Sequence, residues 1–248
     1  MKAGSRRLLN RLFWWRRLYL PPRRRAVAMP AEDYFRYKVG KRVPKNVTRV
    51  RIHHSVEQIP PSTFKDCTAL VEVKLHEGLR RIGYGAFRSC SSLTRIIVPP
   101  SVTIIDAFAF VYCTALVEVV LHEGLRQIGH CAFRNCSSLL RINIPPSVRS
   151  IDNYAFEECN KLVEVELHYG LRTIGKNAFR NCSSLIHIII PPTVEAIYYS
   201  AALKLYFNIP SSVTSIGDNP FDGCVGLLWI WAKPYLEIDT IKHVLSYL

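Results

Sequence analysis

The chain lacks the motifs that mark several large classes of protein. Its longest apolar runs fall well short of the roughly 18 residues that a membrane-spanning helix needs. Arginines interrupt every apolar run near the N-terminus, so the stretch of about seven apolar residues that a secretory signal requires is missing. Walker, HExxH, GxSxG and GxGxxG motifs are absent, and cysteines and histidines do not occur at zinc-ligand spacing. We therefore expect no catalytic residue, no metal, no cofactor and no small-molecule substrate, and we predict that the protein is not an enzyme.

Acidic residues are missing from one segment, residues 1–25, which holds nine basic residues. The whole chain has 33 basic and 19 acidic residues, so the rest of it keeps 24 basic and 19 acidic ones. That modest excess argues against nucleic-acid binding by the main body. Residues 1–25 have three open interpretations: a disordered basic tail, an organelle-targeting segment, or a helix that contacts a membrane surface.

A 23-residue repeat organises most of the chain beyond the basic segment. A phenylalanine, a cysteine and a leucine recur together with this period, which indicates a solenoid of stacked coils. The expected core positions of the coils are Phe64, Cys67, Leu70, Phe87, Cys90, Leu93, Phe110, Cys113, Leu116, Phe133, Cys136, Leu139, Phe156, Cys159, Leu162, Phe179, Cys182, Leu185, Phe221, Cys224 and Leu227. Corner sequences alternate between His-Glu-Gly-Leu and Pro-Pro-Ser-Val, so the deeper period is 46 residues.

Each repeat predicts a strand, a corner and a return segment. The fold class is therefore an α/β solenoid with a parallel β-sheet on one face and short helices or turns on the other. We expect a lead-in or cap at 26–46, about nine strand-bearing rungs at 47–232 with a degenerate one at 197–210, and a capping helix at 233–248. Residues 47–52 should form the first rung.

Seven of the eight cysteines occupy one repeat position, which favours buried free thiols and a reducing compartment. Disulfide pairing or metal binding between stacked coils stays open. An intracellular location, cytoplasmic or organelle-targeted, is expected. The eighth cysteine, Cys131, follows His130 and is interpreted as a surface or half-buried thiol rather than a nucleophile.

The third and fifth positions of each predicted strand should point outward. Down the third position run Arg49, Glu72, Arg95, Glu118, Arg141, Glu164, His187, Tyr206 and Trp229. Their alternating charges favour cross-strand ion pairs, while a polar recognition surface stays open. The aromatic residues at the end of the row are either interface anchors or covered by the C-terminal helix. The candidate protein-binding residues are Arg95, Arg141, His187, Tyr206, Trp229 and Trp231.

The pattern Leu-x-x-Ile-x-Ile-Pro-x-x-Val-x-x-Ile-x-x-x-Ala-Phe-x-x-Cys resembles the BspA-like class of leucine-rich repeats over roughly residues 47–232. The resemblance implies a repeat solenoid, and some members look like cell-surface adhesins. Three functions follow as hypotheses. The first is a non-enzymatic scaffold that binds an unknown protein through its sheet face. The others are an adhesin-like surface protein, and a membrane- or nucleic-acid-associated protein that acts through residues 1–25.

Overall fold

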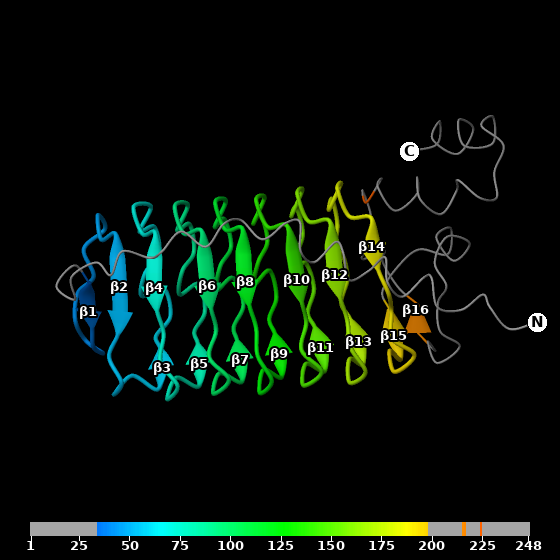
Figure 1. The fold of residues 1–248 in the computed structure, drawn as a ribbon, viewed down its shortest axis with the longest axis horizontal. Helices are drawn as coiled ribbons and strands as arrows, with labels where there is room; N and C mark the ends of the chain where they lie inside the picture. Colours follow the sequence, from blue (N-terminus) through cyan, green and yellow to red (C-terminus); the bar gives the residue numbers. More distant parts are fainter. Residues whose placement is uncertain (1–33, 198–214, 217–223, 225–248) are drawn as a thin grey trace, which may run out of the picture. The chain divides into compact units, whose positions relative to one another are not determined.

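The computed structural model of the protein describes residues 34–197, 215–216 and 224. All of them belong to one compact unit, Tyr34–Leu248. Within it every paired strand is parallel to its neighbour, and successive coils place their strands side by side (Figure 1). This arrangement is the predicted repeat solenoid.

Two rows of strands run along the solenoid, where the sequence predicted one. The first row comprises β1 (Phe35–Tyr37), β2 (Arg49–Ile52), β4 (Glu72–Lys74), β6 (Arg95–Ile97), β8 (Glu118–Val120), β10 (Arg141–Asn143), β12 (Glu164–Glu166) and β14 (His187–Ile188). The second row comprises β3 (Gln58–Ile59), β5 (Arg81–Ile82), β7 (Ile104–Ile105), β9 (Gln127–Ile128), β11 (Ser150–Ile151), β13 (Thr173–Ile174), β15 (Ala196–Ile197) and β16 (Ser215–Ile216). Each strand of the second row has only two residues, too few to show a period in the sequence.

The phenylalanines of successive coils form a continuous stack in the core. From Phe64 to Phe179 neighbouring ring centroids lie 5.1–5.3 Å apart, and the ring planes differ by at most 6°. All six rings are fully buried, as are the repeat leucines from Leu70 to Leu185. Residues 221 and 227 of the predicted core lie outside the described residues.

Each repeat cysteine is buried, and from Cys90 onward each donates its S–H to the main-chain oxygen of a phenylalanine in an earlier coil, whereas the Cys67 Sγ lies 3.9 Å from the Pro44 oxygen. The Cys90 Sγ lies 3.1 Å from the Phe64 oxygen, and the Cys113 Sγ lies 3.2 Å from the Phe87 oxygen. The same bond recurs at Cys136, Cys159, Cys182 and Cys224. A thiol is a small apolar group with one weak donor, so it fills the core and still satisfies a buried carbonyl.

The face opposite the first row of strands consists of turns, and none of the described residues is helical. Two residues per coil have a left-handed backbone, with φ between 53° and 62°. They are Ser62, Gly85, Phe108, Cys131, Tyr154 and Asn177 before each phenylalanine, and Asp66, Ser89, Tyr112, Asn135, Glu158 and Asn181 before each cysteine.

These left-handed residues turn main-chain N–H groups toward the next coil. The N–H groups of Gly85, Phe87 and Ser89 donate to oxygens of the following coil at 2.8–3.0 Å. A helix would satisfy such groups within its own coil. The turns therefore add a third ladder of hydrogen bonds between coils, beside those of the two rows of strands. The sequence predicted short helices or turns on this face, and the described coils have turns.

The solenoid begins earlier than expected, because β1 precedes the predicted first rung and pairs with β2. Tyr37 of β1 is buried and packs edge-on against Phe64, with centroids 5.2 Å apart. The Lys45 ammonium donates to the main-chain oxygen of Lys65. In later coils the equivalent oxygen accepts a hydrogen bond from a main-chain N–H of the preceding coil. The lead-in segment thus covers both the core and the carbonyls of the first coil.

Candidate functional site: the outward face of the first sheet

Side chains at the third and fifth strand positions point outward, and those at the fourth point into the core. In β6, for example, Arg95 and Ile97 are exposed while Ile96 is buried. This alternation gives the first row of strands one solvated face, which we call the outward face.

The charged row on the outward face forms ion pairs between neighbouring strands. Arg49 Nε lies 3.8 Å from a Glu72 oxygen. Arg95 Nε lies 2.9 Å from Glu118. In the next such pair of strands, Arg141 Nη1 lies 3.5 Å from Glu164. Exposed pairs of this kind contribute about 0.2–1 kcal/mol each.

These ion pairs all fall within 46-residue units, which we call doublets: β2 with β4, β6 with β8, and β10 with β12. Inside each doublet three residue pairs are in register. Between doublets the pairing weakens: β8 and β10 share one residue pair, and β4 and β6 end two separate sheets. The sequence duplication is therefore also a structural unit.

A groove of about 610 Å³ lies at the boundary between the first two doublets. Its walls come from β4 and β6 and from the residues just before them, and they include Val71, Glu72, Lys74, Thr94, Arg95 and Ile97. The lining includes both apolar and charged groups, which suits a partner with both kinds of side chain.

Apolar side chains are exposed along the same face. Ile97 is 46% exposed and Ile189 is 66% exposed. A further set, which we call the apolar row, stands one residue before β4, β8, β10 and β14, and it comprises Val71, Val117, Leu140 and Ile186, each at least 40% exposed. Sequence analysis missed this row because position two breaks the alternation from which the outward positions were assigned. Contiguous exposed apolar groups with polar neighbours are typical of interaction sites.

The candidate binding residues separate into two groups. Arg95 and Arg141 lie on the outward face in neighbouring doublets, and His187 of β14 is in register with Glu164. Tyr206, Trp229 and Trp231 lie outside the described residues, as do residues 1–25 and the helix predicted at 233–248. The structure thus brings together the charged half of the candidate site.

Cys131 is only 2% exposed, so its assignment as a surface or half-buried thiol is wrong. Its counterparts in the neighbouring coils are the larger Phe108 and Tyr154, and the His130 ring bridges these two edge-on at 5.2 and 5.6 Å. Burial raises the pKa of the Cys131 thiol. A raised pKa favours the protonated thiol, which is a poorer nucleophile than the thiolate.

A buried ion pair lies on the turn face. Glu157 is 3% exposed, and its Oε2 lies 2.7 Å from Arg134 Nε, in a contact whose alignment is too poor for a hydrogen bond. Its Oε1 lies 3.7 Å from Arg180 Nη1. Burial raises the pKa of Glu157 although the two arginines oppose the shift. Glu157 therefore links three successive coils through its ion pairs with Arg134 and Arg180.

Metal-binding and membrane-spanning features are both missing from the described part of the chain. No group of three His, Cys, Asp or Glu side chains there could hold a metal ion. Those residues also contain no helix with the length and apolar character that a bilayer crossing requires. All eight cysteines are free thiols.

Known proteins support the same architecture. The T. pallidum leucine rich repeat protein has a crystal structure that is 27% identical with a TM-score of 0.63, over 83% of this chain and 88% of that one. A leucine-rich repeat protein from Eubacterium ventriosum is 25% identical with a TM-score of 0.57, over 70% of this chain but 42% of that one. No curated protein matches the chain.

The model of the BspA type leucine rich repeat region, in six copies, matches residues 43–137, 103–228 and 198–236. Proteins with this repeat and fold are typically non-enzymatic scaffolds, and leucine-rich repeat proteins generally bind other proteins. The chain belongs to the BspA-type leucine-rich repeat family.

Proposed function

We propose that the protein is a non-enzymatic scaffold that binds a protein partner through the outward face. The observation that carries this proposal is the exposed apolar row beside the charged row, with the groove between β4 and β6 at one end. The charged row occupies every strand of the first row from β2 to β12, and the apolar row precedes four strands of the same sheet face, so we treat the two rows as one surface.

The dimensions of the face favour a macromolecular partner. From β1 to β14 there are seven steps between strands, which span about 34 Å at roughly 4.8 Å each. A partner that covers this length contacts all three doublets at once. The groove alone is open and mixed in polarity, unlike the enclosed, mainly apolar pockets that hold small molecules.

Arg95 and Arg141 have a specific part in this proposal. Each arginine forms an ion pair with a glutamate of the same doublet, and more than half of its side chain remains exposed. Arginine contributes strongly to protein interfaces because its planar group binds carboxylates and also packs on apolar surface. We place these two residues at the contact with acidic side chains of the partner.

Affinity capture from a source lysate with matched variants tests the proposal. The variant Ile97→Arg, Ile189→Arg adds two charges to the outward face, whereas Gln58→Arg, Gln127→Arg adds the same charge to exposed positions of the second row. We expect one partner to be captured by the wild type and by the control variant, and to be lost by the first. Equal capture by all three proteins refutes the outward face as the binding site.

We also propose that the protein works in a reducing compartment. The support is that eight free thiols, all buried, fill the core without a disulfide among them. Thiol titration of protein purified without reductant and unfolded in urea should find eight reactive groups per chain. A count of four or fewer would contradict this compartment.

A further inference from the structure

Three cationic side chains stand in register at the N-terminal end of the outward face. Arg36 of β1 pairs in register with Arg51 of β2, and Arg51 pairs with Lys74 of β4. Neighbouring positions in such a ladder are about 4.8 Å apart, and like charges that face each other are destabilising. At the third strand position of the same doublets, by contrast, Arg and Glu face each other. This row departs from the charge rule of the rest of the sheet.

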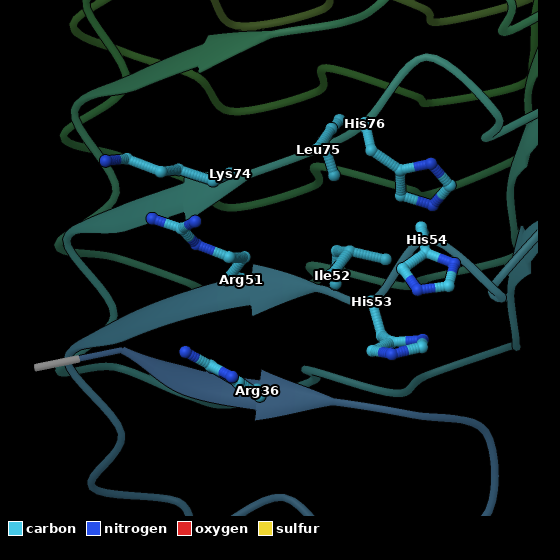
Figure 2. Close-up of a pocket in the computed structure, with 8 residues that line it drawn as sticks. All are labelled: Arg36, Arg51, Ile52, His53, His54, Lys74, Leu75 and His76. Atoms are coloured by element: carbon cyan, nitrogen blue, oxygen red, sulfur yellow. The ribbon is translucent and has the colours of Figure 1, made fainter. Parts of the chain in front are cut away.

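Three histidines lie just beyond the ends of two of these strands. His53 and His54 follow β2, and their rings lie 4.0 Å apart. His76 stands two residues beyond β4. Figure 2 shows the three imidazoles gathered beyond the ends of β2 and β4, while Arg36, Arg51 and Lys74 rise from β1, β2 and β4 with their charged ends directed away from the imidazoles.

The hydrogen bonds fix how two of these rings present their N–H groups. His76 Nδ1 accepts from the Gly78 N–H at 3.0 Å, and its Nε2 donates to the Val56 oxygen at 3.0 Å. Both ring nitrogens of His76 therefore contact main-chain groups of the protein. His53 Nδ1 accepts from the Ser55 N–H at 3.1 Å, which places the ring hydrogen on Nε2.

The six basic side chains line one pocket of about 560 Å³, together with Ile52 and Leu75. No acidic residue is among these eight. The ring of Tyr34 supports the row, with the Arg51 guanidinium 5.2 Å and the Lys74 ammonium 4.4 Å from its centroid. Glu72, 3.7 Å from Lys74, belongs to the neighbouring charged row and also faces Arg49.

The local excess of positive charge acts on His53. Loss of hydration and the nearby His54, Lys38, His76 and Arg36 together lower the pKa of this imidazole. A bound anion would offset the repulsion that the in-register row creates.

We propose that this pocket binds a phosphate or sulfate group. Guanidinium, ammonium and imidazole N–H groups are the donors that such oxyanions take, and arginine presents two parallel N–H bonds to them. The row of three cations extends over about 10 Å, which fits linked phosphate or sulfate groups better than one isolated ion. The site requires no protein partner, so it stands independently of the function proposed above.

Titration of the 248-residue chain with inorganic tripolyphosphate, followed by NMR of the histidine rings, tests the site. The variant Arg51→Gln, Lys74→Gln removes two charges from the pocket. The control Arg80→Gln, Arg126→Gln removes two charges from exposed positions beside the second row of strands. Both variants keep residues 1–25, so any binding by that basic segment is common to them. Circular dichroism checks folding, and Lys74→Gln alone replaces the double variant if the latter unfolds.

We expect tripolyphosphate to shift the His53 and His54 signals, and the pocket variant to weaken binding by about tenfold or more. The control should weaken it by no more than about twofold, the effect of net charge alone. Equal weakening by both variants, or unshifted histidine signals, would overturn the proposal.

A parallel titration with a heparin-derived sulfated hexasaccharide distinguishes the sources of the oxyanion. Tighter binding of the hexasaccharide than of tripolyphosphate assigns the pocket to sulfate groups on a glycan chain. Tighter binding of tripolyphosphate assigns it to a soluble phosphate compound. Binding of the hexasaccharide that survives in the pocket variant would place glycan contacts elsewhere and count against this site.

Discussion

Truncation of one stacked phenylalanine should damage the whole solenoid. Phe133 is fully buried, and its ring stacks on Phe110 at 5.2 Å and on Phe156 at 5.3 Å. Replacement of a buried Phe by Ala costs about 3–5 kcal/mol. Each lost aromatic pair adds about 0.5–1.5 kcal/mol. We therefore expect Phe133→Ala to lower the free energy of unfolding by about 4–8 kcal/mol, a large part of the stability of an ordinary domain.

Phe133→Leu separates the two contributions. Leucine keeps most of the buried apolar volume and loses both stacking contacts, so the expected loss is about 1–3 kcal/mol. Tyr169→Ala is the matched control, because this aromatic side chain is 72% exposed. Its truncation should change stability by no more than about 0.5 kcal/mol.

Urea unfolding followed by far-UV circular dichroism measures these differences. In a linear array each coil is stabilised mainly by its neighbours, so a defect at a central coil weakens the coupling between the two halves. We expect the Phe133→Ala transition to move to lower urea and to broaden or split. A loss below about 2 kcal/mol would mean that the site collapses around the cavity, and it would refute the stack as a main source of stability.

Three further outcomes follow from titratable groups. Burial raises the pKa of Cys113 to about 12, whereas an unfolded thiol ionises near 9.0, so the folded state loses stability as the pH rises above 9. The free energy of unfolding should fall by about 1.4 kcal/mol for this thiol between pH 8 and pH 10, and urea titrations of Cys113→Ala should lack that increment. Glu157→Ala should cost about 1–3 kcal/mol because it leaves the buried Arg134 Nε without its partner, and a double-mutant cycle with Arg134→Ala that shows no coupling would contradict the pairing. The pKa of His53 lies below its ordinary value, so folding loses stability as the pH falls through and below 6.5. An NMR titration of the His53 ring should show a midpoint below 6.5, and tripolyphosphate should move that midpoint upward. A midpoint at or above 6.5 without anion would contradict the cationic pocket.

The core was predictable because it depends on residue identity at a fixed period. Phe, Cys and Leu recur every 23 residues, and each type has one place in the coil. The left-handed positions were not predictable in this way. Gly85, Phe108 and Cys131 share one such position although they have little chemistry in common. The hydrogen bonds to the next coil impose their conformation, and those bonds exist only once the coils stack.

The candidate site was predictable only in part. The outward direction of Arg95 and Arg141 follows from strand alternation, and their ion pairs follow from the 46-residue duplication. The groove between β4 and β6 could not be predicted. A Glu of one doublet precedes an Arg of the next both at β4 and β6 and at β8 and β10, but only β8 and β10 keep a residue pair in register. The row formed by Arg36, Arg51 and Lys74 could not be predicted, because the register of Arg36 depends on a lead-in strand outside the repeat.

The measurement that tests the central proposal most directly is site-specific photo-cross-linking of the captured partner. A photoreactive phenylalanine analogue would replace one residue at a time: Ile97 on the outward face, Gln127 on the second row, or Tyr112 on the turn face, all of them exposed. The account predicts a cross-linked partner at Ile97 and none at the other two positions. Cross-linking at Gln127 or Tyr112 without any at Ile97 would contradict the assignment of the outward face as the binding surface.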